Sequence, residues 1–542
     1  MPSADIPDYE DVYAALSVAA LDREIFPDGK FNAAIACCDR WPLAAVALRW
    51  IDKQGRGHDW TFGELARRSR QFANLLVARG VRPGDRVAGL LTRRPELVVT
   101  LLGAFRAGAV YQPVFTAFGP RAIEARLISG EPELVVADAD QTRKLDGLDF
   151  LAGKVLSFKS DEGGKSDFWD LLDRYPDSFA AVPRAVADPF LILFTSGTTG
   201  TPKGVLAPLS LLRAVWVYMR YAVDLRADDR FWNLADPGWA YGLYYAVIGP
   251  LLLGQATMMN ESGFDPAAAC KLIERFGVTN LAGSPTAYRA LMAADPAIVA
   301  PLKGKLRVVS SAGEPLNPEV IRWFDRALDT PILDHFGQTE VGMALCNHHG
   351  LHHRRQPGSM GFSMPGFRTV VIDDAGKELE AGQPGQLAVD RAASPLFWFD
   401  GYWRRSQQPF VGQYYTTGDT AELNDDGSIS FVSRADDVIT SSGYRIGPFE
   451  VESALLEHPA VLEAAVIGKP DPQRTEIVKA IVVLRPGIRP SAALGEELQA
   501  FVKTRLSAHA YPREVAFTEE LPKTPSGKIQ RFILRAAETS PS

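Results

Sequence analysis

Residues Leu191 to Val205 read L-I-L-F-T-S-G-T-T-G-T-P-K-G-V, an apolar run followed by a loop of small and hydroxylated residues. The apolar run predicts a buried strand. The loop is typical of a polyphosphate site, because glycines let backbone N–H groups turn toward one point while hydroxyls and an ammonium add donors. It is not a Walker loop, since Pro202 stands where that pattern requires its second Gly; the alternative is a solvated turn. The donors that we expect to face phosphate are Thr195, Ser196, Gly197, Thr198, Thr199, Gly200 and Lys203.

Length and composition fit a large globular enzyme. The chain has 542 residues, 46% hydrophobic and 23% charged, which predicts several structural units. The net charge of −7 does not favour nucleic acid or an anionic membrane as a partner. Four cysteines form neither a disulfide framework nor a zinc motif, and the acidic N-terminus lacks signal or transit features, so we expect a reducing, cytoplasmic location. The uncharged run from Pro237 to Asn260 is broken by Gly and Pro, which predicts a buried helix, a turn and a strand instead of a membrane span.

Strand-like segments alternate with helical ones on both sides of the loop, from Asp85 to Asp138 and from Leu209 to Asp334. This alternation predicts layered, parallel α/β sheets. Ligands of such sheets bind at the carboxyl ends of the strands. The loop and two further polar segments, Ser311 to Pro315 and His335 to Glu340, come at or directly after such ends, so we expect all three to meet on one face.

The pattern changes twice toward the C-terminus. From about Gly358, short β-type runs alternate with Gly/Pro turns, which predicts a small β-barrel. After Ser433 the elements form a compact α+β unit. The predicted fold is therefore α/β, with a large N-terminal domain over residues 1–433, its barrel-like part at about 358–433, a hinge at 434–437 and a small mobile domain at 438–542.

The loop S-G-T-T-G-T-P-K-G resembles the nucleotide loop of the AMP-forming adenylating superfamily, which includes acyl-CoA synthetases, luciferases and peptide-synthetase adenylation domains. The resemblance extends from about residue 30 to 538. It implies a carboxylate–CoA ligase in which ATP, with Mg²⁺, activates a carboxylate as acyl-AMP, and CoA then takes the acyl group.

Three further motifs match the family's nucleotide site. By the resemblance, Gly313, Glu314 and Pro315 carry the adenine ring, Thr339 touches the α-phosphate, and Glu340 holds Mg²⁺, an ion that favours one or two carboxylates plus phosphate oxygens. In the motif T-T-G-D, Asp419 matches the ribose ligand, and Arg434 shares that role. The remaining nucleotide-binding residues implied are Asp334, His335, Phe336, Gly337 and Gln338.

The C-terminal motifs imply the chemistry and a domain rotation. Lys528, in P-K-T-P-S-G-K, matches the family's catalytic lysine, whose charge offsets the repulsion between carboxylate and α-phosphate; Lys523 is expected to be a surface lysine. Because Lys528 and the phosphate loop lie in different predicted domains, we expect the small domain to turn about Asp436 between the two half-reactions. Residues 442–447 read S-G-Y-R-I-G and resemble a second glycine-rich loop of the family. By this resemblance, Arg445 binds the α-phosphate, and Ser442, Gly443 and Tyr444 bind CoA.

The acid is predicted to be larger than acetate. Acetyl-CoA synthetases carry a bulky Trp where this chain has Gly337, and the C-terminal run resembles medium-chain acyl-CoA synthetases. Many relatives have a His shortly after the loop, where this chain has Ala207 and Pro208. The acyl-pocket candidates are Trp239, Ala240, Tyr241, Ala312 and Gly337.

Four histidines between His348 and His353 are expected in a solvated loop, with a metal site as the alternative.

Two other functions remain open at this point: an acyl-AMP ligase that loads a carrier protein, and a regulatory protein that kept the nucleotide site and lost turnover. The intact Lys528, Glu340 and Asp419 disfavour the second. The expected partners are ATP, CoA and a small carboxylic acid, with a homo-oligomer possible.

Overall fold

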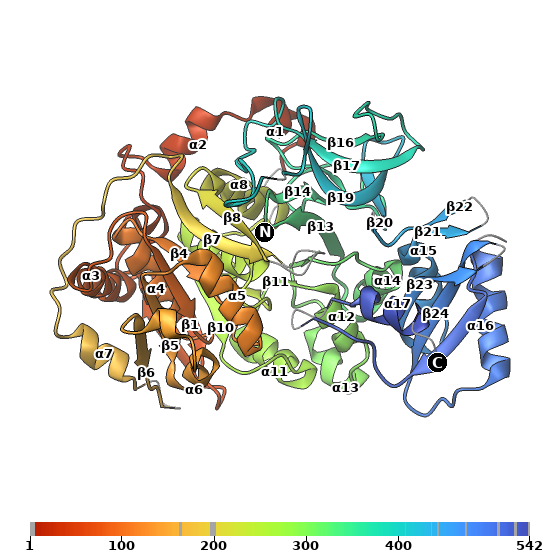
Figure 1. The fold of residues 1–542 in the computed structure, drawn as a ribbon, viewed down its shortest axis with the longest axis horizontal. Coiled ribbons are helices and arrows are strands. Elements are labelled where there is room, and N and C mark those ends of the chain that lie inside the picture. Colours follow the sequence, from red (N-terminus) through yellow and green to blue (C-terminus); the bar gives the residue numbers. More distant parts are fainter. Residues whose placement is uncertain are drawn as a thin grey trace.

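The computed structural model describes residues 6–161, 165–195, 202–406, 408–434, 436–441, 444–471, 474–506, 510–524 and 528–539. Two large sheets form the N-terminal part, and a smaller sheet with its own helices forms the C-terminal part (Figure 1). None of the helices in the described ranges combines the length and the apolar character that a bilayer crossing needs.

The six-stranded sheet has the order β6-β5-β3-β4-β7-β8. Its neighbours are parallel except β7 and β8, which pair as a hairpin on either side of the phosphate loop. The predicted buried strand before the loop is β7, and the covering helices begin at Pro95 and Pro120, where the fixed φ of proline suits a first helical turn. The bounds are β3 Arg86–Leu90, β4 Val110–Pro113, β5 Leu134–Asp138, β6 Val155–Phe158, β7 Pro189–Thr195, β8 Lys203–Pro208, α3 Phe62–Ala78, α4 Pro95–Arg106, α5 Pro120–Gly130, α6 Ala139–Thr142 and α7 Asp167–Leu172.

The nine-stranded sheet has the order β15-β14-β13-β12-β11-β9-β10-β1-β2. Its central strands, β13 to β1, are parallel, and the outer ones are antiparallel. Helix α11 shows the local rules clearly: Asp265 caps its start by accepting from the N–H of Ala268, and Gly277 ends it at φ 61°. The bounds are β1 Val46–Ile51, β2 Gly57–Thr61, β9 Phe231–Asn233, β10 Thr257–Asn260, β11 Asn280–Gly283, β12 Val308–Ala312, β13 Ile332–Gln338, β14 Gly342–Cys346, β15 Phe362–Ser363, α8 Leu211–Val217, α9 Ala240–Gly242, α10 Gly249–Leu252, α11 Pro266–Phe276, α12 Pro285–Met292, α13 Pro296–Val299 and α14 Pro318–Leu328.

Helices α8 and α9 are each followed directly by a π-helical turn. The turn after α8 is Tyr218–Ala222, and the turn after α9, in the apolar segment that follows Trp239, is Leu243–Ile248. Such turns widen the backbone and often occur at functional sites. Both turns contribute to one hydrophobic core that also reaches the strands of the two large sheets.

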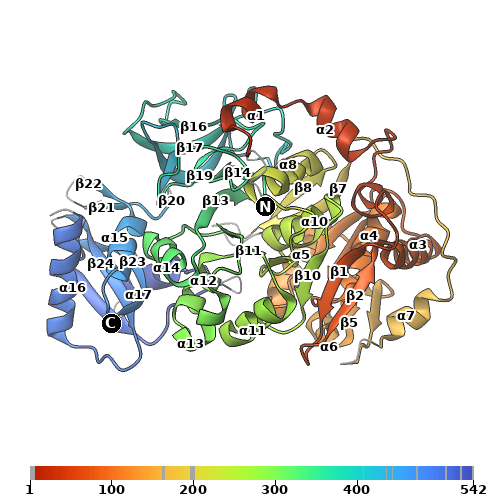
Figure 2. The ribbon, with the colours of Figure 1, turned by 180° about the vertical axis from the view of Figure 1, so that it is seen from behind.

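A five-stranded antiparallel sheet occupies the β-rich segment that the sequence predicted as a small barrel. It lies beside the N-terminal helix α1 (Figure 2), whereas α2 packs against α8. Tyr9 and Tyr13 of α1 donate hydrogen bonds to the carbonyl oxygens of Ser363 and Phe367, 2.8 and 2.7 Å away. The bounds are α1 Tyr9–Ala15, α2 Val18–Ile25, β16 Thr369–Ile372, β17 Pro384–Asp390, β18 Phe410–Val411, β19 Tyr414–Leu423 and β20 Ile429–Arg434.

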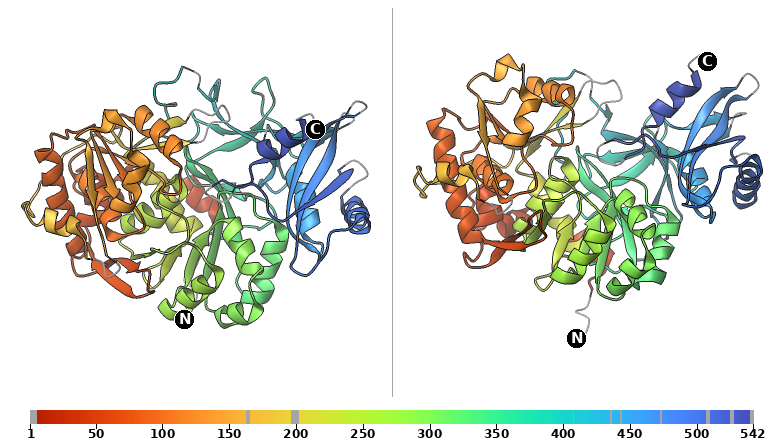
Figure 3. Two further views of the ribbon diagram at one scale, coloured as in Figure 1. Left: turned by 60° about the horizontal axis from the view of Figure 1, so that its bottom comes forward. Right: turned by 90° about the horizontal axis from the view of Figure 1, so that it is seen from below.

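The C-terminal elements form a separate α+β layer with a core of its own. They lie against the helices of the nine-stranded sheet (Figure 3), and Asn317 at the start of α14 donates to the Ser453 hydroxyl, 3.0 Å away. The bounds are β21 Ile439–Ser441, β22 Tyr444–Ile446, β23 Val461–Asp471, β24 Thr475–Leu484, β25 Glu514–Thr518, α15 Pro448–Leu456, α16 Ala492–Arg505 and α17 Arg531–Thr539. The α/β class with a smaller C-terminal unit is confirmed.

Candidate active site

A cavity of about 910 Å³ lies where the two large sheets and the C-terminal unit meet. The three polar segments predicted to converge all reach it, although β7 belongs to one sheet and β12 and β13 to the other. Strand β13 continues to Gln338 instead of ending at Asp334 as predicted, because it pairs with the antiparallel strand β14. The predicted site residues that line the cavity are Thr195, Lys203, Trp239, Ala240, Tyr241, Gly313, Glu314, Pro315, Asp334, His335, Phe336, Gly337, Gln338, Thr339, Glu340, Asp419, Arg434 and Lys528.

The two ends of the phosphate loop are held together by the β7–β8 hairpin, in which Thr195 pairs with Lys203. The predicted donors Ser196, Gly197, Thr198, Thr199 and Gly200 lie outside the described residues. The Lys203 amine lies 5.0 Å from the centroid of the Tyr402 ring, a cation–π arrangement at the cavity wall.

Glu340, the predicted metal ligand, is buried and bonded to the same tyrosine. The Tyr402 hydroxyl donates to Glu340 Oε1, 2.8 Å away. Burial raises the pKa of Glu340, while the Tyr402 hydroxyl and the charges of Lys203 and Arg434 oppose that rise. The sequence analysis missed Tyr402, because a tyrosine in a loop carries no sign that it will meet a carboxylate 62 residues away.

Asp419 is fixed by two partners. Gln338 Nε2 donates to its Oδ2 at 2.8 Å, and Arg434 donates to its Oδ1 at 2.9 Å. Tyr415 in turn donates to Gln338 Oε1, 2.7 Å away, and so sets the orientation of that amide. Burial raises the pKa of Asp419, and the charges of Arg434 and Lys528 lower it. The two predicted ribose ligands, Asp419 and Arg434, therefore form an ion pair at the cavity wall.

Glu314 is also held in place. The Thr286 hydroxyl lies 2.8 Å from its Oε1, and Arg289 donates to its Oε2 at 2.9 Å. Both partners lie on α12, and no sequence signal pointed to either. Gly313 has φ 100°, a conformation that favours glycine, and a Cβ there would lie 3.5 Å from the Trp239 ring.

Residues 334–337 of β13, before Gln338, line the cavity and are buried or partly buried. Burial raises the pKa of Asp334 well above its usual range. His335 donates from Nε2 to the Asn347 carbonyl oxygen, 3.1 Å away, so its Nδ1 accepts from the Tyr218 hydroxyl at 2.9 Å. Burial lowers the pKa of His335 to about 4, which keeps the ring neutral near neutral pH.

The two lysines of the last motif differ in their bonding, and Lys523, expected to be a surface lysine, is partly buried and lines the cavity. Lys523 donates to both oxygens of Glu463, at 2.7 and 2.8 Å. Lys528 is exposed and faces the cavity, close enough for its charge to lower the pKa of Asp419. The C-terminal unit therefore presents Lys528, and not Lys523, as a free amine among the described residues at this wall.

The predicted CoA loop and hinge are described only in part. Ser442 and Gly443 lie outside the described residues, and of Tyr444 and Arg445 only the backbone, in β22, is described. Asp436 lies 3.6 Å from Arg434, and the neighbouring Asp437 accepts from Arg535 of α17 at 2.6 Å.

The acyl-pocket candidates do not all line the cavity. Ala312 is fully buried in the core and is not part of the lining, whereas Tyr244, Tyr245, Phe115 and Phe118 are, and the sequence did not single them out. Gly337 has a further constraint: a Cβ there would lie 2.3 Å from the Gly342 carbonyl oxygen, because β14 passes close by. Strand packing therefore favours glycine at this position.

The expectation of a solvated histidine loop is wrong for His348 and His349, which are buried. His353 is partly buried, and only His352 of the four is exposed as expected. The His348 backbone N–H donates to His353 Nε2 at 2.9 Å, and Tyr9 packs on the His348 ring at 5.5 Å between centroids. The described residues contain no group of three potential metal ligands, here or elsewhere. The loop is buried because the N-terminal helix α1 packs over it, a long-range contact that local sequence does not reveal.

The chain is similar to known proteins along nearly its whole length. Residues 36–403 match the family described as AMP-binding enzyme, and residues 450–528 match the AMP-binding enzyme C-terminal domain. The acetyl-coenzyme A synthetase of Bacillus subtilis (strain 168) is 37% identical over 98% of this chain and 96% of its own. The mitochondrial acyl-coenzyme A synthetase ACSM3 of Rattus norvegicus is 35% identical, over 94% and 90%. The crystal structure of an acyl-CoA synthetase from Brucella canis is 55% identical, with a TM-score of 0.79 and coverage of 98% and 99%.

The cavity gathers the motifs that resemble the nucleotide site of adenylate-forming enzymes, and the comparisons place the chain in that class. The chain belongs to the AMP-binding enzyme family. Within that family it is an AMP-forming acyl-CoA synthetase, a carboxylate–CoA ligase, as the sequence predicted.

Proposed function

We propose that the protein converts ATP and a carboxylic acid larger than acetate, medium-chain or aromatic, into acyl-AMP and pyrophosphate, and then transfers the acyl group to CoA with release of AMP. The observation that carries this proposal is the convergence of Lys203, Asp419 and Lys528 on one cavity from three parts of the chain. Aromatic side chains along the same cavity suit an acyl chain or ring. Free, buried cysteines suit a reducing, cytoplasmic setting.

The residues divide the work as follows. Thr195, Lys203 and the intervening loop bind the triphosphate, Gly313 to Pro315 carry the adenine, and Asp419 with Arg434 bind the ribose hydroxyls. Thr339 contacts the α-phosphate. Lys528 lies between that phosphate and the attacking carboxylate, two anions that repel each other, and stabilises the charge that builds up as the new C–O–P linkage forms.

The second half-reaction needs different residues of the C-terminal unit at the cavity. Once pyrophosphate has left, rotation of the C-terminal unit about Asp436 withdraws Lys528 and brings residues 442–445 to the cavity. The thiol of CoA then attacks the acyl carbonyl, the thioester forms, and the carbonyl–oxygen bond to AMP breaks. Rotation of this kind lets one cavity serve two reactions.

The residues present fit Mg²⁺. Glu340 is a buried carboxylate beside the cavity, and one carboxylate with phosphate oxygens is a set that Mg²⁺ accepts. When bound, the ion would neutralise phosphate charge. Tyr402 orients Glu340 for this task through the hydroxyl contact at 2.8 Å.

The test is nucleotide product analysis with ATP, Mg²⁺, CoA and acetate, propionate, butyrate, octanoate or benzoate. We expect AMP only when an acid is present, faster with CoA, and fastest with octanoate or benzoate. AMP release that does not depend on CoA would favour a ligase that loads a carrier protein. ATP binding without AMP formation from any acid would favour a regulatory protein, and the fastest rate with acetate would contradict the proposed acid size.

A further inference from the structure

Within the part of the chain that the structure describes, seven cationic side chains line the cavity, and their ion pairs separate them into two groups. Four are neutralised by a carboxylate of the protein. These pairs are Arg289 with Glu314 at 2.9 Å, Arg434 with Asp419 at 2.9 Å, Lys523 with Glu463 at 2.7 Å, and Arg531 with Glu452 at 2.8 Å. The other three, Lys203, Lys528 and Arg126, form no ion pair with any described residue.

Two of these three cations already have an anion in the proposed reaction. Lys203 faces the triphosphate, and Lys528 faces the carboxylate and the α-phosphate. Arg126 has no such assignment, and nothing in the sequence motifs pointed to it.

Arg126 is a poor candidate for a purely structural arginine. It lies on α5 and is 7% exposed, with its guanidinium carbon 4.1 Å from the centroid of the Phe118 ring. One guanidinium nitrogen donates to the Ala122 carbonyl oxygen at 2.8 Å, and Nε has no acceptor among the described residues. Burial lowers the pKa of Arg126 with no carboxylate to offset the effect. A buried cation without a counter-charge is costly, so the protein gains if a ligand supplies that charge.

The neighbours of Arg126 connect it to the predicted acyl pocket. Phe118 contacts Phe115 at 5.4 Å between centroids, and Phe115 packs directly on Gly238, where a Cβ would lie 2.6 Å from the Phe115 Cα. Gly238 precedes Trp239 of the predicted acyl pocket. Arg126 therefore lines the same cavity as Trp239 and is joined to it through Phe118 and Phe115, in the space that the acid and CoA share under the proposed function.

We propose that Arg126 binds an anionic group of a substrate other than ATP, supplied either by a phosphate of CoA or by a second carboxylate of the acid. Guanidinium groups bind both through paired N–H donors. The inference rests on the proposed function, because it takes the acid and CoA as the substrates that share this cavity.

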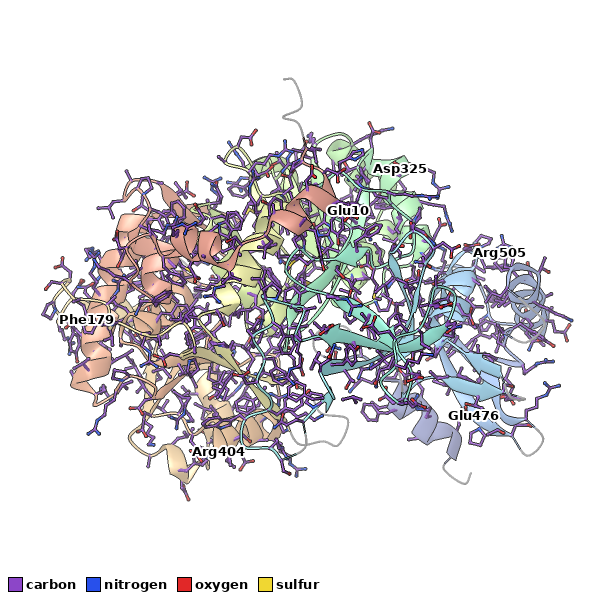
Figure 4. The ribbon with its side chains drawn as sticks, turned by 90° about the horizontal axis from the view of Figure 1, so that it is seen from above. Glu10, Phe179, Asp325, Arg404, Glu476 and Arg505 are labelled. Carbon is purple, nitrogen blue, oxygen red and sulfur yellow. The ribbon has the colours of Figure 1, made fainter. Side chains whose placement is uncertain are left out.

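The experiment compares each anionic substrate with an uncharged counterpart. For CoA the counterpart is pantetheine, which carries the same thiol without phosphates. For the acid, octanoate is compared with its dicarboxylic analogue suberate in ATP–pyrophosphate exchange, which needs no CoA. The variants are Arg126→Met, which keeps the packing over Phe118, and Arg126→Lys, which keeps the charge. Arg404→Met is the control, because Arg404 pairs with Glu131 on the outer surface (Figure 4).

Arg126→Met should raise the KM of one anionic substrate about tenfold or more and leave its uncharged counterpart unchanged, since a bond to a charged partner is lost. Arg126→Lys should retain part of the preference, and Arg404→Met should behave as wild type. If only the ratio of the KM values for CoA and pantetheine changes, the anion is a phosphate of CoA. If only the ratio for suberate and octanoate changes, the anion is a second carboxylate of the acid. If both ratios stay at their wild-type values in Arg126→Met, the proposal is overturned.

Should Arg126→Met fail to fold, the Arg126→Lys comparison decides, because lysine lacks the paired donors; unchanged ratios there also overturn the inference. Octanoate-dependent exchange in the wild type tests the proposed function by itself. Loss of that exchange is therefore distinguishable from a wrong assignment of Arg126.

Discussion

The hydroxyl of Tyr402 lies 2.8 Å from Glu340 Oε1, while the ring of the same tyrosine supports the Lys203 amine at 5.0 Å. One side chain thus positions both the carboxylate and the cation that we assign to the phosphates of ATP. Their spacing is set by the loop that carries Tyr402, whose chain bridges to Val205 of β8. Three segments far apart in sequence are joined at this point.

Tyr402→Phe should weaken ATP binding in the presence of Mg²⁺ by about tenfold, because a hydrogen bond to a buried carboxylate is lost. Calorimetric titration of the protein with ATP in the presence of Mg²⁺ measures this affinity without turnover. Tyr414→Phe is a matched control, since Tyr414 also donates to a carboxylate, Glu378 at 2.9 Å, away from the cavity. Equal ATP affinity in wild type and Tyr402→Phe would contradict the positioning role.

Lys528→Ala should slow acyl-AMP formation by about a hundredfold or more, because the charge between two anions is removed from the transition state. Thioester formation from supplied acyl-AMP should continue. Lys523→Ala, in the same segment, serves as the control, because its amine is bonded to Glu463. A parallel loss of both half-reactions would show that Lys528 does not have the assigned role.

The ion pair between Arg322 of α14 and Glu457, which follows α15, helps to hold the C-terminal unit where Lys528 reaches the cavity. Arg322→Ala should therefore slow adenylation severalfold and leave the transfer to CoA unchanged or faster. Single-turnover assays of each half-reaction measure this. Arg326→Ala, on the same helix, removes a contact to Glu319 and serves as the matched control. An identical effect of both variants would show that the pair of Arg322 and Glu457 does not hold the C-terminal unit in place.

The buried histidine loop should make stability depend on pH. Burial holds the pKa of His348 well below its usual range, so the native ring stays neutral where the unfolded chain takes up a proton. The unfolded state then binds more protons as the pH falls below about 6.5, and the native state loses stability. Buried carboxylates with raised pKa values, such as Glu340, act in the opposite direction, so the comparison must be between variants.

His348→Phe should lose less stability than the wild type between pH 7 and pH 5.5, by about 1 kcal/mol, as measured by denaturant unfolding at each pH. His352→Phe in the same loop should follow the wild type, because the His352 side chain is exposed. Parallel curves for wild type and His348→Phe would refute the argument.

Gly337→Ala should lower the melting temperature, because the added methyl carbon would overlap the Gly342 carbonyl oxygen. Thermal unfolding measures this effect. A stable Gly337→Ala protein would show that β14 can move away.

Ala240→Phe narrows the cavity from a position that lines it, and should shift the substrate preference from octanoate toward shorter acids. The panel of acids measures this shift.

The sequence alone determined the α/β alternation, the strand before the phosphate loop and the motifs that gather at the cavity, because these depend on local patterns of apolar, glycine and hydroxyl residues. It also determined the family, since those motifs recur at recognisable spacings. The partners of the site residues were decided only by the tertiary structure. Tyr402 at Glu340, the free charge of Arg126 and the burial of His348 each arise where distant segments pack together. Burial and pairing are properties of those long-range contacts, and no local pattern along the chain encodes them.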